Sequence, residues 1–497
     1  MILVINVGLK NSRCIVFDSN GKELFNKSTP IKTIIKNNFV EQSVKEIEKK
    51  TFSIFLEATK KFKNKINHIT VTTSSCCLVC LDNKNKPLMN SIIVSDSRSA
   101  KECNEINKLL TNFKNNDKCR PDLMLPKIVW IKNNKKKIFN QTSKFLNIGD
   151  YLSYKITGHF FTDKYNASKF FLDKTENKYF KKIYDKYNIN INKLPKIYNN
   201  KIFEINKKFN KKFSLKKNCQ FVQTSYDAIS SMLGCGATSS GDLGDMSGTV
   251  SNIRILTSKK PYIRNKILHT FFHPFEKFYI VGGSNNLGGG IIEWIKNAFF
   301  SKNEFKYSYF DKLSSENFYG LIFLPYLMGE RAPIWDSKIR GIFFGLSKDH
   351  EKKDLIVSIL VGMAYSLRNM VDAIETNTNS KIKKIFVSGG LSRINIINQL
   401  KADITGRTVI QLNNHETTSI GSAIWVEKII NNTHLKKLQK KYIKIKKIYK
   451  PNKASFKKHN NFYRIFKKLN FTLQEIQHQN YEFKSQINKK MSILHNL

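Results

Sequence analysis

The segment from Leu324 to Leu360 constrains the fold of this chain more than any other. It reads LPYLMGERAPIWDSKIRGIFFGLSKDHEKKDLIVSIL and joins a glycine-containing loop to an apolar run that opens with Asp354. An acidic residue at the start of such a run indicates a helix N-terminus. The order of small, aromatic, glycine and acidic positions is too specific for a generic loop and helix. The positions that carry the pattern are Gly341, Phe343, Gly345, Leu346, Asp354, Leu355, Ser358, Ile359 and Leu360.

Length and composition indicate a folded chain of two or three domains, since 497 residues allow each domain its own core. A hydrophobic content of 41% and a charged content of 25% are ordinary for such a protein. No run of 18 apolar residues is present, and the start MILVINVG lacks the features of a secretory signal, so we expect no membrane span. Eight cysteines in a chain of this size do not indicate a disulfide framework, and a reducing cytoplasm is expected.

The net charge of +47 raises the question of nucleic-acid binding, because Lys and Arg neutralise phosphates. The excess is spread through the chain together with Asn, Ile and Phe, as in a compositionally biased protein. No helix-turn-helix, zinc-finger or RNA-binding signature accompanies it. We therefore expect no specific nucleic-acid partner, while the positive field should favour anionic small molecules.

The order of predicted elements suggests two related halves. The N-terminus reads as strand, turn, strand, turn and strand, in ILVINVG, RCIVFD and KELFNKST. A similar strand–turn–strand pattern recurs in DMSGTVSNIRIL, after a polar, glycine-containing segment at residues 239–245. We expect the domain boundary there, giving segments 1–244 and 245–430. Residues 431–497 should form a Lys-rich closing helix and tail.

With these features together, the chain resembles the FGGY carbohydrate kinases, which transfer the γ-phosphate of ATP to a hydroxyl of a sugar or sugar acid. The segment at 324–360 meets one family signature except at Val361, where an acidic or amide residue is usual. The resemblance covers about residues 1–470. It implies an α/β, actin-like (ribonuclease H-like) ATPase fold with two related domains and a nucleotide and substrate cleft between them. ATP and Mg²⁺ are the implied cofactors.

Glycine-rich turns in this family hold the phosphates of ATP, because glycine lets the backbone approach phosphate closely. Here the turns are Asn6–Arg13 in the first domain, Ser247–Thr249 at the start of the second, and Ser388–Gly390 late in the chain. A single such turn is a weak signal, but three in the family order are strong. The residues assigned to ATP are Gly8, Lys10, Arg13, Gly248, Thr249, Gly289, Gly389 and Gly390.

The resemblance identifies Asp227, in TSYDAISSMLGCG, as the catalytic base that takes the proton of the sugar hydroxyl. The alternative is that this Asp only caps a helix N-terminus. The two roles are compatible, and its position before the SGT turn favours catalysis.

The substrate region is most similar to the gluconokinase branch of the family. The stretches ITVTTSSCCLVCLD, SIIVSDSRSAKE, GERAPIWD and GGSNNLGGGIIEW carry this similarity. The substrate residues it implies are Ser75, Cys76, Asp96, Arg98 and Asp227. An Arg near a carboxylated substrate would be natural, but Arg98 could equally pair with Asp96, and both alternatives stay open.

Several positions depart from the family pattern. Asn6, a weak metal candidate, replaces the Asp that helps to organise metal and phosphates, and Leu9 replaces a Thr. Ser75 and Cys76 replace a Met-His pair, and Val94 replaces a Trp. Loss of the carboxylate at Asn6 weakens the attraction for Mg²⁺. Reduced activity is therefore expected as an alternative to full turnover.

The cysteines at 77 and 80 form a C-x-x-C that could suggest zinc. On a strand these two side chains point to opposite faces, which disfavours joint ligation. We expect no structural metal here.

The sequence thus predicts an ATP-dependent carbohydrate kinase, with D-gluconate as the favoured acceptor and 6-phosphogluconate as the product. A xylulokinase or another pentulose kinase is the alternative enzyme, and a catalytically impaired kinase-fold binding protein is the alternative of a different class. The expected partners are small molecules only, with a homodimer as the candidate assembly.

Overall fold

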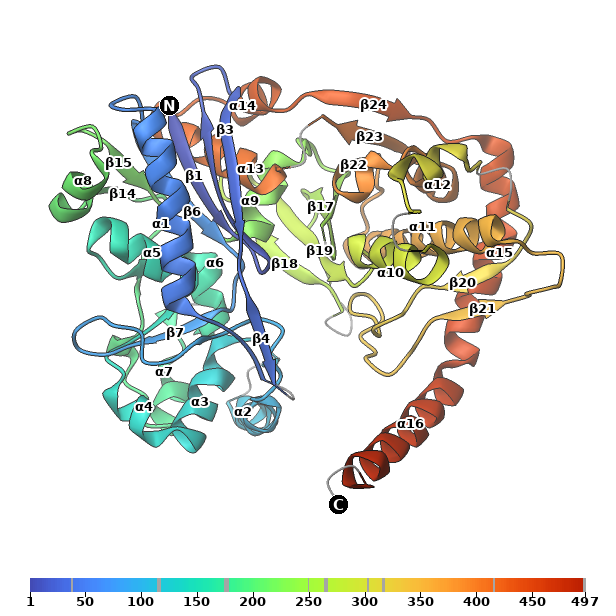
Figure 1. The fold of residues 1–497 in the computed structure, drawn as a ribbon, viewed down its shortest axis with the longest axis horizontal. Helices are drawn as coiled ribbons and strands as arrows, with labels where there is room; N and C mark the ends of the chain where they lie inside the picture. The colour runs from blue at the N-terminus through green and yellow to red at the C-terminus, as the bar shows by residue number, and fades with distance from the viewer. Residues whose placement is uncertain are drawn as a thin grey trace. The chain divides into compact units, whose positions relative to one another are not determined.

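The computed structural model describes residues 1–36, 39–113, 118–173, 178–248, 250–262, 267–301, 304–314, 318–413 and 416–494. The chain divides into two compact units (Figure 1). Unit 1 contains Met1–Gly234 and Thr418–Tyr442, and unit 2 contains Cys235–Thr417 and Ile443–Leu497.

Unit 1 is built on a six-stranded sheet with the order β14-β15-β6-β1-β2-β3. Strand β1 pairs antiparallel with β2 and parallel with β6, so two hairpins continue into a crossover-connected parallel strand. The strands are β1 (Ile2–Val7), β2 (Asn11–Phe17), β3 (Glu23–Pro30), β6 (His68–Thr73), β14 (Ile202–Glu204) and β15 (Gln220–Val222). The three strands predicted at the N-terminus are confirmed.

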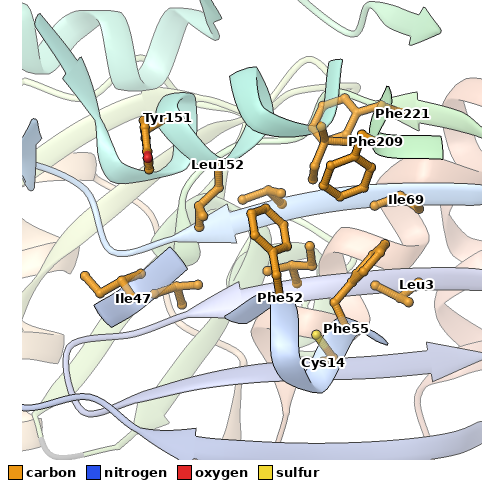
Figure 2. Close-up of a cluster of buried hydrophobic side chains, with 14 of the residues drawn as sticks. Leu3, Cys14, Ile47, Phe52, Phe55, Ile69, Tyr151, Leu152, Phe209 and Phe221 are labelled. Carbon is orange, nitrogen blue, oxygen red and sulfur yellow. The ribbon is translucent and has the colours of Figure 1, made fainter. Parts of the chain in front are cut away.

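Helix α1 (Val44–Lys61) covers one face of this sheet (Figure 1). Its start is fixed by Ser43, whose hydroxyl accepts a hydrogen bond from the Glu46 amide, and Lys60 and Lys61 stand in its last turn, where cations are favourable. Its buried face supplies Phe52 and Phe55 to an aromatic cluster with residues of α8 (Lys207–Phe213). Figure 2 shows this core between the sheet, α1 and α5 (Ile148–Thr157).

A second, five-stranded sheet of unit 1 has the order β4-β5-β8-β7-β9. Cys77, directly before β7, belongs to the first core, and Cys80 on β7 belongs to a separate core together with Cys76. Cys77 and Cys80 therefore lie on opposite faces, as predicted from strand geometry. Within the described residues, no group of three or more His, Cys, Asp or Glu is placed to hold a metal. The strands are β4 (Thr33–Lys36), β5 (Phe39–Gln42), β7 (Leu78–Leu81), β8 (Ser91–Ile92) and β9 (Lys144–Asn147).

Further helices of unit 1 surround the two sheets. They include α2 (Ala100–Asn112), α3 (Met124–Asn134), α4 (Lys136–Gln141), α6 (Lys164–Ala167), η1 (Ser168–Phe170), α7 (Lys181–Lys186), α9 (Asp227–Gly234), α13 (Thr417–Asn431) and α14 (Leu435–Tyr442). Helix α5 is capped at its C-terminus by Gly158, whose φ of 82° gives a left-handed cap.

Unit 2 repeats the topology of unit 1 in its seven-stranded sheet, ordered β18-β19-β17-β16-β22-β23-β24. Strand β16 pairs antiparallel with β17 and parallel with β22, as β1 does with β2 and β6. The predicted recurrence of the strand–turn–strand pattern is thus confirmed as a repeat of fold. The strands are β16 (Asp242–Ser247), β17 (Ser251–Thr257), β18 (His269–Phe272), β19 (Tyr279–Asn285), β22 (Lys384–Gly389), β23 (Thr408–Leu412) and β24 (Ile445–Tyr449).

The core of unit 2 is organised by α11 (Lys352–Thr378), which is long and apolar enough to cross a membrane. Of its most apolar 18-residue window, 83% is buried inside the protein, so α11 is a core helix. Its N-terminus carries the predicted acidic residue, and Asp354 completes a capping box with Glu351. Around it lie α10 (Gly289–Phe299), α12 (Asn395–Thr405), α15 (Lys453–Thr472), α16 (Gln474–Leu494), β20 (Ile322–Leu324) and β21 (Ile342–Phe344).

The observed units differ from the expected segments 1–244, 245–430 and 431–497. Residues 242–247 form β16, which is hydrogen-bonded on both sides, so the break comes earlier, after Gly234. Residues 418–442 return to unit 1, because α13 packs closely on α9. A Cβ on Gly421 would lie 1.7 Å from the Ser230 carbonyl oxygen. The expected closing segment is therefore shared by the two units, and the expected tail is helix α16.

Candidate active site

The first predicted phosphate turn joins β1 to β2 in unit 1. The Gly8 amide donates to the Asn11 carbonyl at 3.0 Å, and Asn6 pairs with Arg13 across the two strands. Side chains of directly opposed residues share one face of a sheet. Lys10 is exposed at the turn. The structure therefore brings Gly8, Lys10 and Arg13 to one hairpin end.

Asn6 is held from the C-terminal part of unit 1. Its Nδ2 atom donates to the hydroxyl of Ser419, at 3.1 Å, across 413 positions of sequence. Ser419 is fully buried on α13. No sequence pattern pointed to Ser419, because only the return of the chain to unit 1 brings it to β1.

The predicted base Asp227 lies next to this hairpin through Ser74. The Ser74 amide donates to the Val7 carbonyl at 2.9 Å, and its hydroxyl donates to Asp227 Oδ2 at 3.2 Å. Asp227 is half-buried and opens α9, where the positive end of the helix dipole stabilises a carboxylate. Asp227 therefore both starts a helix and lies near the first phosphate turn, the two positions that the sequence analysis described as compatible. Ser74 was not predicted, although it directly precedes the predicted Ser75.

The loop before Asp227 is fixed by a buried polar network. The carboxylate of Asp163 accepts hydrogen bonds from the Ser225 hydroxyl at 2.8 Å and from the amides of Tyr165 and Asn166. Burial raises the pKa of Asp163, although these hydrogen bonds act in the opposite direction. Asp163 therefore ties the start of α6 to the approach to Asp227.

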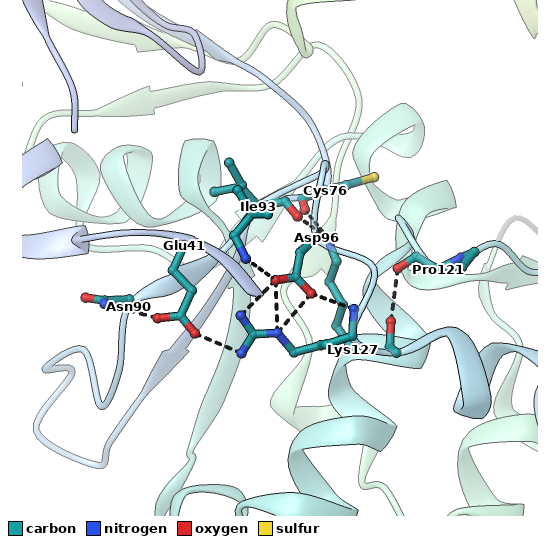
Figure 3. Close-up of polar contacts among 10 residues, drawn as sticks. Glu41, Cys76, Asn90, Ile93, Asp96, Pro121 and Lys127 are labelled. Carbon is teal, nitrogen blue, oxygen red and sulfur yellow. Dashed lines mark hydrogen bonds and ion pairs between the residues drawn. The ribbon is translucent and has the colours of Figure 1, made fainter. Parts of the chain in front are cut away.

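Arg98 forms the ion pair with Asp96 that the sequence left as one of two alternatives (Figure 3). Its Nη2 atom lies 2.7 Å from Asp96 Oδ2, and its Nη1 atom lies 2.8 Å from Glu41 Oε1. The guanidinium also stacks 4.0 Å from the Phe39 ring centre, and only 2% of the side chain is exposed. The positive charge of Arg98 is therefore paired with two carboxylates of the protein, those of Asp96 and Glu41.

Ser75 and Cys76 directly follow Ser74, the hydrogen-bond partner of Asp227. Ser75 is half-buried, and Cys76 is buried with a φ of 61°. The Cys76 carbonyl accepts a hydrogen bond of 2.7 Å from the fully buried amine of Lys127, which also donates to Ile93 (Figure 3). Burial lowers the pKa of Lys127, while the nearby Cys76 and Cys77 thiols act against that shift. The backbone at Cys76 is thus fixed from α3.

The remaining predicted ATP residues gather in unit 2. The Gly289 amide donates to the Gly248 carbonyl at 2.7 Å, so the second turn meets the N-terminus of α10. Gly389 pairs with Ser247 across β16 and β22, and a Cβ there would lie 2.3 Å from the Ser247 carbonyl oxygen. Gly390 has open space around it. Thr249 lies outside the described residues.

Amide groups at a helix N-terminus and at glycine turns are suited to bind phosphate oxygens. Two polar contacts fix the end of β16, directly before the Gly248 turn. Ser247 Oγ donates to Asp245 Oδ1 at 2.7 Å, and the buried Lys401 amine donates to Asp245 Oδ2 at 2.6 Å. The Asp245–Lys401 pair was not predicted. The sequence indicates position 245 only as the junction of the polar segment with the second half, and only the fold brings α12 to it.

The GERAP loop of the opening segment is fixed by Glu330. Its Oε1 atom accepts from the amides of Asn286 and Arg331, at 2.8 and 2.7 Å. Burial raises the pKa of Glu330 to about 7. This loop therefore braces the stretch that leads into Gly289.

Comparison with known proteins fits this geometry. Residues 1–234 match the N-terminal domain of the FGGY family of carbohydrate kinases, and residues 247–426 match its C-terminal domain. This chain belongs to the FGGY family of carbohydrate kinases. It is therefore a carbohydrate kinase, with ATP as the phosphate donor that the family implies.

Relatives with different acceptors are similar to this kinase. A xylulose kinase of Lactococcus lactis is 27% identical over 506 residues, covering 97% of this chain and 99% of the relative. A gluconokinase of Bacillus subtilis is 25% identical, covering 85% and 86%. Relatives of both kinds thus match at similar identity.

Solved structures agree on the fold. A gluconate kinase from Lactobacillus acidophilus gives a TM-score of 0.85 at 24% identity, covering 95% of this chain and 98% of the other. A xylulose kinase from the same organism gives 0.85 at 23% identity, with the same coverage. The prediction of a two-domain, actin-like α/β kinase fold is confirmed.

Proposed function

We propose that this FGGY kinase transfers the γ-phosphate of ATP to a terminal hydroxyl of a sugar acid, with D-gluconate as the preferred acceptor and 6-phosphogluconate as the product. The observation that carries the proposal is the placement of Asp227. Its carboxylate is half-buried, opens a helix and is joined through Ser74 to the Gly8 hairpin.

The chemistry follows from these groups. Asp227 accepts the proton of the acceptor hydroxyl as the new O–P bond forms and the bond from the γ-phosphorus to the bridging oxygen breaks, releasing ADP. Backbone amides at Gly8, Gly248, Gly289, Gly389 and Gly390 bind phosphate oxygens, with Lys10 and Arg13 adding positive charge. We place Ser75 and Cys76 beside the acceptor and propose that Asp96 and Arg98 fix the adjoining loop.

Mg²⁺ neutralises charge on the transferring phosphates when it is bound. Magnesium sites commonly use one or two protein side chains together with substrate phosphates and water. The amide oxygen of Asn6 fits that limited role, because the amide nitrogen already donates to Ser419. Asn6 is the candidate ligand in this chain, and it is weaker than a carboxylate.

The alternative acceptor is xylulose, supported by the similarity to the L. lactis xylulose kinase. A second alternative is a binding protein without turnover, supported by Asn6 and Cys76. We place the activity in the cytoplasm, since the described cysteines are free thiols.

The test is a coupled assay of ATP consumption with gluconate, xylulose, ribulose and glycerol as acceptors. Consumption with gluconate well above the others is expected. Consumption with xylulose alone would transfer the assignment to the pentulose kinase alternative. Absence of turnover with all acceptors, for a protein shown to bind ATP, would support the binding-protein alternative.

A further inference from the structure

A cation within reach of an acceptor that is bound at Asp227 would favour a sugar acid, and Arg98 does not supply it. The Arg98 guanidinium is taken up by Asp96 and Glu41 and is 2% exposed. This inference rests on the proposed function and asks which side chains of the same site would bind the carboxylate.

Arg120 has the required geometry. Its Nε and Nη2 atoms donate to Asp122 at 2.8 and 2.9 Å, in a bidentate pair. Within the described chain, Nη1 has no hydrogen-bond partner, and 31% of the side chain is exposed. A guanidinium held along one edge by a carboxylate can offer its other edge to a second carboxylate. Arg120 is therefore an oriented, accessible cation.

Lys169 is a second cation in the same region. It lies in η1, directly after α6, and its ammonium is 5.0 Å from the ring centre of Tyr226, the neighbour of Asp227. Because Asp163 caps α6 and also binds Ser225, η1 and the approach to Asp227 are held by one carboxylate. Lys169 is thus positioned relative to the base.

The charges of both cations influence the Cys76 thiol, which lies in the segment that carries Ser74. Burial raises the pKa of the Cys76 thiol, and so does the charge of Asp122, while Lys169 and Arg120 act in the opposite direction. Cys76, Cys119 and Phe170 belong to one hydrophobic core. Cys119 precedes Arg120 and Phe170 follows Lys169, so both cations come from segments that pack on the core of Cys76. Cys76 is two residues from Ser74, the hydrogen-bond partner of Asp227.

We propose that the Arg120 guanidinium and the Lys169 ammonium bind the carboxylate of the acceptor, and that this pair selects a sugar acid over a neutral sugar. The carboxylate end of the acceptor lies at Arg120, and the hydroxyl at its other end reaches Asp227.

The experiment compares D-gluconate with D-glucitol, which has a CH₂OH group in place of the carboxylate. Calorimetry measures the Kd of each compound for the full chain without nucleotide, so the result does not depend on turnover. Wild type should bind gluconate more tightly than glucitol. Arg120→Met and Lys169→Met should each raise the Kd for gluconate about ten- to hundredfold, as for loss of a charge-assisted hydrogen bond. The Kd for glucitol should stay unchanged.

Two controls separate recognition from indirect effects. Arg120→Met alone leaves the negative charge of Asp122, so Arg120→Met with Asp122→Asn removes both charges. Gluconate binding should remain weak in this double variant. The matched control for Lys169 is Lys212→Met, which removes an ammonium 5.3 Å from the Phe213 ring on the distant helix α8. It should bind gluconate as wild type does.

The inference is overturned if the variants bind gluconate with wild-type Kd, or if wild type does not prefer gluconate to glucitol. Recovery of gluconate binding in the double variant would also overturn the role of Arg120. Selective, Arg120-dependent binding of gluconate without phosphate transfer would support the inference and refute the proposed function, so the two failures are distinguishable.

Discussion

The hydroxyl of Ser74 donates a hydrogen bond of 3.2 Å to Asp227, and the Ser74 amide donates to the carbonyl of Val7, next to Gly8. One residue thus connects the end of β6 to the proposed base and to the first phosphate turn. The three segments are far apart in sequence. The parallel pairing of β1 with β6 brings Ser74 to Val7, and the hydroxyl of Ser74 then reaches Asp227.

Asp227→Asn should abolish phosphate transfer and leave the affinity for ATP nearly unchanged, because the carboxylate acts on the acceptor hydroxyl. Turnover and ATP binding, measured separately, check this. Ser74→Ala, which keeps the carboxylate and removes one hydrogen bond, is the matched control and should cost about tenfold in kcat at most. Near wild-type turnover of Asp227→Asn would refute the assignment.

Asn6→Asp should raise turnover and lower the Mg²⁺ concentration needed for half-maximal rate, since a carboxylate attracts Mg²⁺ more strongly than an amide. The Ser419 hydroxyl can donate to the new carboxylate, so the contact at this position is kept. Adding Leu9→Thr should contribute on the order of 1 kcal/mol through a further hydrogen bond to phosphate. The two sites share a hairpin, and their effects need not add. No gain in rate at any Mg²⁺ concentration would contradict the prediction.

Gly389→Ala and Gly390→Ala form a matched pair of neighbouring substitutions. At Gly389 the φ of 85° and the 2.3 Å approach to the Ser247 carbonyl oxygen leave no room for a Cβ. We expect a loss of roughly 2–4 kcal/mol in the free energy of unfolding. Gly390→Ala has open space and should change stability by less than about 0.5 kcal/mol. Because the proposed function places the Gly390 amide on a phosphate oxygen, Gly390→Ala should still weaken ATP binding. Equal stability of both variants would exclude this account.

Arg98→Met should destabilise the protein by about 3–5 kcal/mol, because it leaves Asp96 and Glu41 without their buried partner. Denaturant unfolding measures this loss. Under conditions where the variant is folded, its KM for the acceptor should be close to wild type. A large rise in KM with unchanged stability would instead assign Arg98 to substrate binding.

Glu330 should make stability depend on pH in a defined direction. Its folded pKa is raised from 4.5 to about 7, so the folded state binds a proton more readily than the unfolded state. Its stabilising contribution to the free energy of unfolding is fully present below about pH 4.5. This contribution is lost as the pH rises to about 7, a change of about 3 kcal/mol. Glu330→Gln should remove this dependence. The free energy of unfolding of both proteins is measured between pH 5 and 8. The same pH dependence in wild type and Glu330→Gln would contradict the prediction.

The sequence by itself determined the family, the order of strands at the start of each half, and the residues that stand at turns and helix starts. These features are local: a glycine turn, an acidic helix start or a strand pattern is encoded within a few neighbouring residues. The resemblance to the family rests on such local patterns, and it pointed to Gly8, Gly248, Gly389 and Asp227. The strand alternation also correctly separated Cys77 from Cys80.

Only the tertiary structure decided which of these residues meet and which charges are already paired. The return of residues 418–442 to unit 1 brings Ser419 to Asn6, and the crossing of α12 brings Lys401 to Asp245. The sequence could not distinguish a free Arg98 from one enclosed by Asp96, Glu41 and Phe39. Long-range pairing depends on how sheets and helices close around a core, and that information is spread over the whole chain rather than over any one motif.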